Sequence, residues 1–444
     1  MSLKPQKIHF IGIGGIGISA LARFLKAQGI EVSGSDMAEG AVTKQLKSIG
    51  IAVNIPHCKE APEGADLVIH SAIIKSDNIE ILRAKELGIP VLSRKEALCM
   101  ILGEKQVYAI AGAHGKSTTT AILSAILKEA SALIGAESKE FHSNARTLNS
   151  PLVVFEADES DKSFLFCNPY CAIVTNAEPE HMETYGHNLE EFHQAYYDFL
   201  KLAKKRVINA EDEFLGKLDL EAIRLYPSKE ICEISYTLKD NQPQTRFRLI
   251  HQGKDYGYFE VYGLGEHIAI DAALAILSVV DFMPKDLIAQ NLQNYKGIKK
   301  RFDILESEKC VIIDDYAHHP TEIRATLKAI KKYQELINQK EICAIWQPHK
   351  YSRILDNLED FITCFEGVNQ LVILPVYSAG EAAIPIDFEG LFSHYNPVFA
   401  DCIQREKNQI KLLKNNEVLF TIQEGIIVGF NAGNLTYQLR GGIV

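Results

Sequence analysis

The chain reads Gly112-Ala113-His114-Gly115-Lys116-Ser117-Thr118 between an apolar run at residues 107–111 and a helix-like segment at residues 119–128. In a glycine loop that joins a strand to a helix, backbone N–H groups face phosphates, the lysine reaches the outer phosphates and the hydroxyl can bind Mg²⁺. The usual spacing places the first glycine where this chain has Ile110. An ordinary Gly-rich turn is the alternative, but the order of strand, loop, Lys-Ser and helix favours a site for a nucleoside triphosphate.

Composition limits the partners that we expect for this chain. Its 444 residues predict about three domains rather than one core, and 47% of them are hydrophobic. The net charge of -10 argues against a general nucleic-acid-binding protein, because such proteins carry a basic face. No stretch approaches the ~20 apolar residues of a membrane span. Nine scattered cysteines indicate reduced thiols, so we expect a cytoplasmic protein without nucleic-acid or membrane partners.

Each third of the chain alternates short Val/Ile-rich runs with helical segments, a pattern typical of parallel sheets with crossover helices. We therefore expect an α/β protein with domains at residues 1–104, 105–298 and 299–444. Residues 231–261 are more polar and strand-like, which predicts an antiparallel sheet that flanks the middle domain.

A second glycine-rich turn lies near the start of the chain, at Gly12-Ile13-Gly14-Gly15-Ile16-Gly17. It joins a strand-like run to a helical segment, and Asp36 ends the next strand-like run. Glycines let the backbone approach phosphates, and the acid can bind ribose hydroxyls, as in dinucleotide-binding proteins. NAD, UDP or another diphosphate would satisfy the same backbone donors, and a tight turn without a ligand is a further alternative.

Acidic residues follow the strand-like run at residues 152–155 and read Glu156-Ala157-Asp158-Glu159-Ser160-Asp161. In an open parallel sheet this end of a strand faces the ligand crevice, so one of these acids is a candidate to hold Mg²⁺ opposite Ser117. The spacing does not choose between Glu156 and Asp158, and a solvated acidic loop is the alternative. His181, after another strand-like run, could bind a metal, carry a proton or begin a helix.

The last third carries two further polar clusters. Asp314-Asp315-Tyr316-Ala317-His318-His319-Pro320-Thr321-Glu322 follows an apolar run, and helix capping does not explain why acids, a tyrosine and histidines gather there. The second cluster reads Gln347-Pro348-His349-Lys350-Tyr351-Ser352-Arg353. Lys350 and Arg353 are spaced to share a helix face and could hold a carboxylate or phosphate, although such a pair is often a solvated face.

Taken together, these motifs resemble those of the Mur ligases, enzymes of bacterial peptidoglycan synthesis. The resemblance covers nearly the whole chain, in seven ordered segments at residues 8–17, 34–36, 114–116, 156–161, 178–185, 314–322 and 347–353. It implies an N-terminal Rossmann-like domain for a UDP-sugar and a central P-loop ATPase-type domain with a mixed sheet. It also implies a C-terminal Rossmann-like domain for the incoming amino acid.

The resemblance further implies a chemistry, with ATP and Mg²⁺ as cofactors. The ATP γ-phosphoryl group would pass to the lactyl carboxylate of UDP-N-acetylmuramate, and the amine of L-alanine would attack the resulting acyl phosphate to form an amide. Positioning and charge neutralisation would do most of the catalytic work. The sequence leaves open whether the enzyme is a monomer or a homodimer.

The resemblance assigns residues to each part of this chemistry. The implied ATP-binding residues are Gly112, Ala113, His114, Gly115, Lys116, Ser117, Thr118, His267 and Asp271. The implied Mg²⁺ ligands are Ser117, Glu156 and His181. The implied substrate-binding residues are Gly12, Gly14, Gly15, Gly17, Asp36, His70, Ser71, Arg301, Tyr316, His349 and Lys350. The implied catalytic residues are Lys116, Glu156, His181, His318 and Arg353.

Some residues depart from the family pattern. Ala113 stands where threonine is usual, and Lys350 replaces an arginine, which exchanges a planar fork for a point charge. Ile268 and Asp271 stand where asparagines commonly follow the histidine of the ATP-base segment, although Asp271 could still accept a hydrogen bond from the adenine amino group.

Three other functions are alternatives to this expectation. A related ligase attaches a recycled peptide to the same UDP-sugar, but the Glu159-Ser160-Asp161 and Gln347-Pro348-His349 segments favour the alanine reaction. A nicotinamide-dependent dehydrogenase would leave the loop around Lys116 unexplained. A noncatalytic nucleotide-binding regulator would not need the intact Lys116, Ser117, Glu156 and His181.

Overall fold

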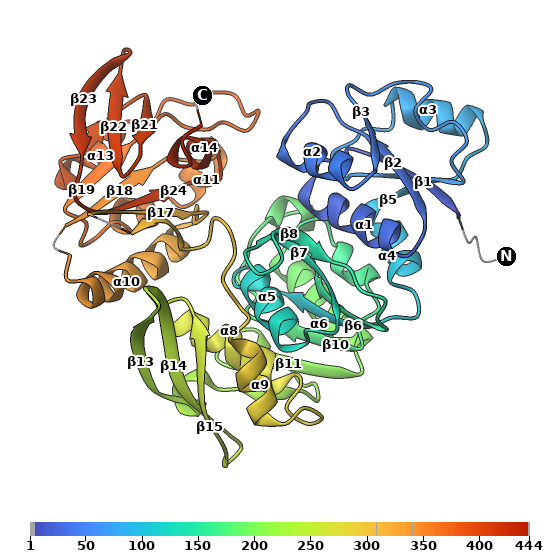
Figure 1. Ribbon diagram of the computed structural model, residues 1–444, viewed down its shortest axis with the longest axis horizontal. Helices are drawn as coiled ribbons and strands as arrows, with labels where there is room; N and C mark the ends of the chain where they lie inside the picture. Colours follow the sequence, from blue (N-terminus) through green and yellow to red (C-terminus); the bar gives the residue numbers. More distant parts are fainter. Residues whose placement is uncertain (1–4, 308, 340, 443–444) are drawn as a thin grey trace. The chain divides into compact units, whose positions relative to one another are not determined.

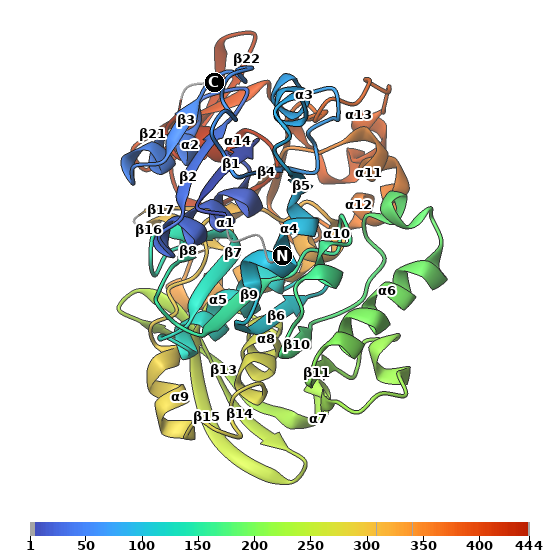
Figure 2. The ribbon, with the colours of Figure 1, turned by 90° about the vertical axis from the view of Figure 1, so that its right-hand side faces the viewer.

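The computed structural model describes residues 5–307, 309–339 and 341–442 (Figures 1 and 2). The chain divides into two compact units. The first comprises Met1–Glu233, Phe247–Val261 and Ala269–Lys296, and the second comprises Ile234–Arg246, Tyr262–Ile268 and Gly297–Val444. This division does not separate the two large sheets of the first unit from each other. The domain boundaries expected at residues 104 and 298 therefore remain predictions.

The first sheet of the first unit is parallel and has five strands in the order β3-β2-β1-β4-β5. The strands are β1 (Lys7–Ile11), β2 (Glu31–Ser35), β3 (Ala52–Asn54), β4 (Leu67–His70) and β5 (Val91–Ser93). The helices between and after them are α1 (Ile16–Ala27), α2 (Ala41–Ser48), α3 (Ile79–Glu86) and α4 (Arg94–Leu102). The strand order reverses between β1 and β4, and the carboxyl ends at such a point form the usual ligand crevice.

The second sheet of the first unit has seven strands in the order β12-β11-β10-β6-β9-β7-β8. Its strands are β6 (Gln106–Ala111), β7 (Ser131–Ser138), β8 (Ser143–Arg146), β9 (Leu152–Glu156), β10 (Cys171–Val174), β11 (Lys205–Asn209) and β12 (Ile223–Leu225). Only the β7–β8 pair is antiparallel, so the expected mixed sheet is confirmed. Strand β6 lies between β9 and β10, and their carboxyl ends therefore meet at one edge.

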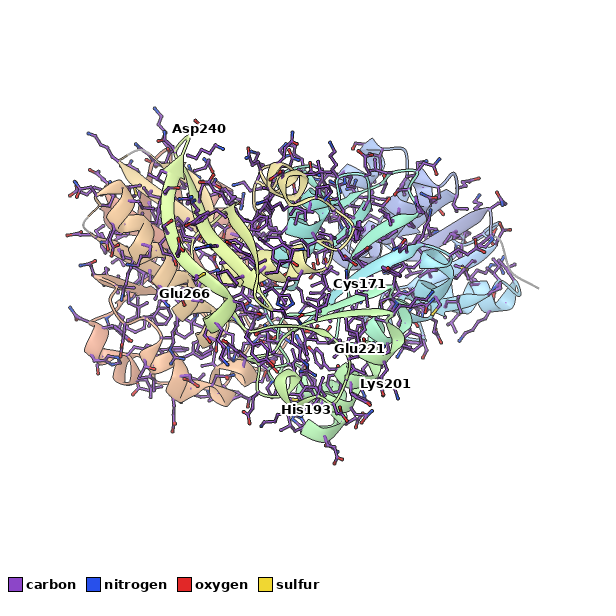
Figure 3. All side chains as sticks on the ribbon, turned by 90° about the horizontal axis from the view of Figure 1, so that it is seen from below. Cys171, His193, Lys201, Glu221, Asp240 and Glu266 are labelled. Atoms are coloured by element: carbon purple, nitrogen blue, oxygen red, sulfur yellow. The ribbon has the colours of Figure 1, made fainter. Side chains whose placement is uncertain are left out.

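Helices and short turns complete the central part of the chain. They are α5 (Lys116–Ile126), η1 (Ser163–Phe166), η2 (Met182–Tyr185), α6 (Leu189–Leu202), η3 (Leu215–Lys217), α7 (Pro227–Glu230), α8 (Glu266–Leu277) and α9 (Lys285–Leu292). A separate three-stranded sheet is formed by β13 (Ile231–Lys239), β14 (Gln242–His251) and β15 (Lys254–Tyr262), at the residues where a flanking sheet is expected. Figure 3 shows Asp240 at the tip of this sheet, and His193 and Lys201 on α6.

One continuous hydrophobic cluster joins the two sheets of the first unit. It contains Phe10 of β1 and Leu21 of α1 as well as Phe155 of β9 and Phe199 of α6, all of which are buried. Burial of aromatic and aliphatic side chains is the main stabilising contribution to such a core. The two glycine-rich loops of this unit are therefore carried by strands that share one packed interior.

The second unit contains a six-stranded sheet in the order β16-β17-β24-β18-β19-β20. Its strands are β16 (Asp303–Ser307), β17 (Cys310–Asp315), β18 (Ile342–Trp346), β19 (Gln370–Ile373), β20 (Val398–Phe399) and β24 (Gly425–Phe430). All pairs are parallel except β16–β17, and the expected Rossmann-like fold is confirmed. The helices of this unit are α10 (Pro320–Ile337), α11 (Tyr351–Asp356), α12 (Leu358–Thr363), α13 (Phe388–Leu391) and α14 (Leu435–Leu439), with a short turn η4 (Ser393–Tyr395).

Two further features complete the second unit. Strands β21 (Cys402–Glu406), β22 (Gln409–Lys414) and β23 (Glu417–Ile422) form a small antiparallel sheet. Trp346, at the end of β18, is 1% exposed and packs against Phe361, Phe365 and Phe392.

Among residues 5–307, 309–339 and 341–442, no helix combines the length and the apolar character needed to cross a membrane.

Candidate active site

The phosphate loop joins β6 to α5 and turns at two glycines. Gly112 has a φ of 141° and Gly115 a φ of 82°, which side-chain-bearing residues rarely adopt. A Cβ atom on Gly112 would lie 2.1 Å from Oγ1 of Thr175, so this position has no room for a side chain. Helix α5 begins at Lys116, earlier than the expected start at Thr119, because Gly115 already forms its N-cap.

Asn176, two residues after the end of β10, holds this loop in place. Its Oδ1 accepts a hydrogen bond from the His114 backbone N–H at 3.0 Å, and its Nδ2 donates to the His114 carbonyl at 2.9 Å. The Thr175 hydroxyl donates to the same carbonyl. Sequence reasoning did not assign Asn176, although its place after a strand adjacent to β6 was an available signal.

The ammonium of Lys116 is folded back against its own loop. It donates to the carbonyl of Gly112, to the carbonyl of Ala113 at 3.0 Å and to Oε1 of Glu159 at 2.8 Å. Burial lowers the pKa of Lys116, but the carboxylates of Glu159, Glu156 and Asp158 together outweigh this effect and raise the pKa above its ordinary value, so the lysine stays charged. Glu159 is 1% exposed, and burial raises its pKa to about 7 despite the lowering effect of Lys116.

Ser117 and Glu156 are brought together as candidate metal ligands. The Ser117 hydroxyl donates to Oε1 of Glu156 at 2.9 Å, and the Gly135 backbone N–H donates to Oε2 at 2.6 Å. Burial raises the pKa of the Glu156 carboxyl, and the hydrogen bond from Gly135 lowers it. Asp158, the alternative that the spacing left open, instead pairs with Arg94 at 3.3 Å. The contacts therefore favour Glu156 as the carboxylate opposite Ser117.

His181 lies in a second group of oxygen and nitrogen ligands. One ligand atom each from Glu159, Glu180 and His181 all lie within 4.8 Å of one another. His181 has a φ of 53° and forms the N-cap of η2, so its backbone adopts a conformation uncommon outside glycine. Carboxylates with one imidazole suit a divalent cation, and this donor set is compatible with a metal beside the phosphate loop.

Asp271 of α8 lies against the phosphate loop. It is 5% exposed, and a Cβ atom on Gly115 would lie 2.6 Å from its Oδ1. Asp271, the side chain expected to face adenine, is thus next to the turn that begins α5.

His267 belongs to the second unit, where its ring lies beside Gly265. A Cβ atom on Gly265 would be 2.5 Å from Cε1 of the His267 imidazole.

The glycine-rich turn after β1 is shaped by residues from β2. The backbone N–H groups of Gly12 and Ile13 both donate to the Ser35 carbonyl at 2.9 Å. The carboxylate of Asp36 accepts from Gly14 N–H at 2.7 Å and from Met37 N–H at 2.8 Å. Asp36 therefore holds the turn itself, a role that its assignment as a substrate ligand did not include.

His70 and Ser71 follow β4, the strand that pairs with β1 on the other side. Nδ1 of His70 donates to the Ser71 carbonyl at 2.9 Å, which leaves Nε2 as an acceptor. A Cβ atom on Gly12 would lie 3.2 Å from Cβ of Ser71. The structure thus brings these two residues beside the glycine-rich turn at the reversal point of the sheet.

In the second unit, a cluster of aromatic and basic side chains gathers after β17 and β18. Nδ1 of His318 donates to the Tyr316 carbonyl at 2.9 Å, so its Nε2 carries the lone pair. Nδ1 of His349 accepts from Nη1 of Arg353 at 2.9 Å, so its Nε2 carries the proton. The pKa of each imidazole is lowered to about 4, mainly by burial and in addition by the nearby positive charge of Arg353. The two rings are therefore neutral and have opposite hydrogen-bonding character at Nε2.

Glu322 and Tyr377 support this cluster. Glu322 accepts from Nη1 of Arg301 at 2.9 Å and from the His318 backbone N–H at 3.0 Å. Tyr377 stacks on the His349 ring at 5.6 Å between centroids, and its carbonyl accepts from Lys350 N–H at 3.0 Å. Tyr377 had no predicted role, because no motif surrounds it in the sequence.

Three family models match successive parts of the chain. The model described as "Mur ligase family, catalytic domain" matches residues 7–106, and "Mur ligase middle domain" matches residues 110–279. The model described as "Mur ligase, glutamate ligase domain" matches residues 300–405. Together they cover well over half of the chain.

Individual relatives match nearly end to end. The chain is 55% identical over 438 residues to UDP-N-acetylmuramate–L-alanine ligase of Campylobacter curvus, covering 98% of this chain and 100% of that one. It is 56% identical over 442 residues to the ligase of the same name from Helicobacter pylori, covering 99% and 97%. A crystal structure of UDP-N-acetylmuramate-alanine ligase MurC from Thermotoga maritima is 26% identical, with a TM-score of 0.79 and coverage of 98% and 97%.

Proposed function

We propose that this chain, which belongs to the Mur ligase family, joins L-alanine to UDP-N-acetylmuramate in an ATP-dependent, ADP-forming step of peptidoglycan precursor synthesis. The observation that carries the proposal is the identity of 55% and 56%, over nearly the whole chain, to two ligases of that name. The arrangement of Lys116, Ser117 and Glu156 at one sheet edge supports the ATP-dependent half of the reaction.

The proposed reaction has two chemical steps. An oxygen of the lactyl carboxylate attacks the γ-phosphorus of ATP, the bond to the β–γ bridging oxygen breaks, and ADP leaves. The amine nitrogen of L-alanine then attacks the carbonyl carbon of the acyl phosphate. Phosphate leaves with the electron pair of the C–O bond, and the nitrogen loses a proton to give the amide.

The phosphate loop supplies binding and charge neutralisation in the first step. Its backbone N–H groups and the N-terminus of α5 are oriented to hold phosphate oxygens, and Lys116 is the cation for the outer phosphates. We assign Ser117 and Glu156, which are hydrogen-bonded to each other, as residues that would hold Mg²⁺. We add His181, which lies in the group with Glu159 and Glu180, because it offers an imidazole ligand. Bound Mg²⁺ would neutralise charge that develops on the transferred phosphoryl group.

The UDP-sugar is assigned to the crevice between β1 and β4. Gly12, Gly14, Gly15 and Gly17 allow close approach of a diphosphate, and His70 and Ser71 lie beside them. Arg301, which pairs with Glu322 in the second unit, is assigned to substrate binding as well.

The amino acid is assigned to the cluster of the second unit. Lys350 and Arg353 provide positive charge for its carboxylate, and Tyr316 and His349 provide ring surface and hydrogen-bond donors. His318 is neutral with its lone pair on Nε2, which makes it our candidate to take the proton from the alanine amine.

We further propose that the enzyme is cytoplasmic, that it is a monomer or a homodimer, and that its domain boundaries lie near residues 104 and 298.

One assay tests the proposed reaction. The protein is mixed with ATP, Mg²⁺, UDP-N-acetylmuramate and L-alanine, and ADP, phosphate and product mass are followed. We expect one phosphate per amide and dependence on both substrates. Phosphate release that ignored either substrate, or no amide product, would exclude the reaction. Replacing alanine with glycine, serine or a tripeptide determines the acceptor, and preference for the tripeptide would indicate the peptide-recycling ligase instead.

A further inference from the structure

The hydrogen bonds of Lys116 leave none of its donors for a nucleotide. A lysine ammonium carries three N–H groups. Here they meet the carbonyls of Gly112 and Ala113 and the carboxylate of Glu159, whose Oε1 is 2.8 Å from Nζ. The lysine must therefore break at least one of these contacts before it can donate to a phosphate oxygen.

Glu159 is buried in the interior. Its side chain is 1% exposed, and the Tyr185 hydroxyl donates to its backbone carbonyl at 2.7 Å. Within the part of the chain that the structure describes, its second carboxylate oxygen, Oε2, is buried without a hydrogen-bond partner. A buried carboxylate that satisfies only one oxygen is costly, so Lys116 is the main compensation for its charge.

We propose that Glu159 is the resting counter-ion of Lys116: it holds the lysine against its own loop and releases it when the outer phosphates of ATP arrive. The proposal rests on the proposed function, because it takes Lys116 as the residue that binds those phosphates. Glu159 is a positioning residue in this scheme, since it acts on the nucleotide through Lys116.

The exchange follows from the charges on both sides. Without Glu159 the buried ammonium of Lys116 would have only two carbonyl partners, and an under-compensated buried charge disfavours the folded loop. With Glu159 in place, an incoming phosphate competes with a carboxylate for the same donor. The carboxylate therefore lowers the affinity of the loop for any nucleotide that must displace it.

Glu159 also has neighbours that could compensate it after the exchange. Ligand atoms of Glu180 and His181 lie within 4.8 Å of its carboxylate and of each other. A divalent cation that arrives with ATP could bind there, whereas a nucleotide without a cation would leave Glu159 uncompensated. The competition should therefore be strongest for nucleotide binding in the absence of a divalent cation.

The test measures binding of ADP and of a non-hydrolysable ATP analogue to the full chain in the presence of EDTA, by calorimetry. Glu159→Gln keeps the shape of the side chain and removes its charge. We expect it to lower the cation-free Kd of the ATP analogue by about three- to tenfold. Glu159→Asp, which shortens the reach to Lys116, should change the Kd in the same direction by less. Glu213→Gln, at an exposed acid that pairs with Lys217, is the matched control and should leave the Kd unchanged.

Circular dichroism and UDP-sugar binding verify that each variant is folded. An unchanged or larger cation-free Kd in both folded Glu159 variants overturns the proposal. A result in which the folded Glu159 variants raise the Mg²⁺ concentration needed for activity but leave the cation-free Kd of the ATP analogue unchanged also overturns it, because Glu159 would then act only on the cation and not through Lys116. Failure of the proposed function is distinguishable: Lys116→Met would then bind the ATP analogue as tightly as the unaltered chain.

Discussion

The guanidinium of Arg94 lies 3.3 Å from the carboxylate of Asp158, although Arg94 begins α4, after the last strand of the first sheet, and Asp158 lies in the loop after β9 of the second sheet. The same Nη2 atom donates to the Ser163 hydroxyl at 2.8 Å and lies 3.3 Å from Asp161. A Cβ atom on Gly17 would be 2.7 Å from Nη1 of Arg94, so glycine at this position leaves room for the guanidinium. Arg94 thus connects the glycine-rich turn after β1 with the acidic loop after β9.

Arg94→Gln should weaken catalysis through this connection. The change leaves Asp158 and Asp161 without their shared cation, and Arg94 is only 12% exposed. We expect a ~10- to 100-fold fall in kcat/KM, because small displacements of the acidic loop misplace Glu156. Steady-state kinetics with both substrates measure the effect. Arg83→Gln, which breaks an ion pair with Glu63, is the matched control, and equal losses in both variants would contradict the assignment.

Ser117→Ala should raise the Mg²⁺ requirement. The hydroxyl donates to Glu156 at 2.9 Å, so its removal takes away one proposed ligand and frees the carboxylate to move. We expect the Mg²⁺ concentration for half-maximal activity to rise about tenfold, with little change in the KM for L-alanine. Ser124→Ala, at a buried serine of the same helix, is the control. An unaltered Mg²⁺ titration would remove Ser117 from the set of metal ligands.

Most of the first unit's candidate site could be predicted from sequence, for a topological reason. The phosphate loop and Glu156 both follow apolar strands, and parallel neighbours place such ends at one edge of a sheet. The spacing alone could not choose Glu156 over Asp158, and only the family resemblance pointed to Glu156, because the ion pair that occupies Asp158 comes from Arg94, 64 residues earlier in the chain. Linear spacing contains no information about that long-range ion pair.

The same limit applies to residues that hold the site without belonging to a motif. Tyr377 lies in a loop after β19 and stacks on His349, a contact that depends on how this loop returns past the sheet. The carboxylate of Asp36 accepts a hydrogen bond from Gly14 N–H at 2.7 Å, a contact that the motif does not specify, and its role in substrate binding stays a prediction. A sequence motif specifies which groups are present, and tertiary packing specifies which of their donors and acceptors are already used.

Asp271→Asn should strengthen ATP binding. The carboxylate lies beside Gly115 in the phosphate loop, where its negative charge opposes that of the incoming phosphates. The amide keeps the size and an acceptor oxygen, so we expect the Kd for ATP to fall about three- to tenfold. Nucleotide titration followed by calorimetry measures the change, with Asp281→Asn, at an acid paired with Lys205, as the control. Weaker binding would instead show that the charge of Asp271 is needed, for example to accept from adenine.

His318 should make the second unit less stable in mild acid. Its pKa is lowered to about 4 by burial, an effect that Arg353 and Arg301 increase and that Glu322 and the Tyr316 carbonyl oppose. Because the folded pKa lies below the unfolded value of about 6.5, the contribution is fully present above pH 6.5 and is lost as pH falls toward 4. We therefore expect this single group to account for a loss of about 2 kcal/mol in the free energy of unfolding between pH 7 and pH 5.

The neighbouring His349 ring adds to this loss in the same direction, since its pKa is also lowered to about 4. Denaturant unfolding at pH 7 and pH 5 should therefore show a smaller difference in His318→Asn than in the unaltered chain, because asparagine carries no titrating group. The imidazole resonances of His318 should also stay unchanged between pH 8 and pH 6 in NMR spectra. A His318 titration midpoint above pH 6 would contradict both expectations, and it would mean that Nε2 is protonated where the proposed alanine reaction needs a lone pair.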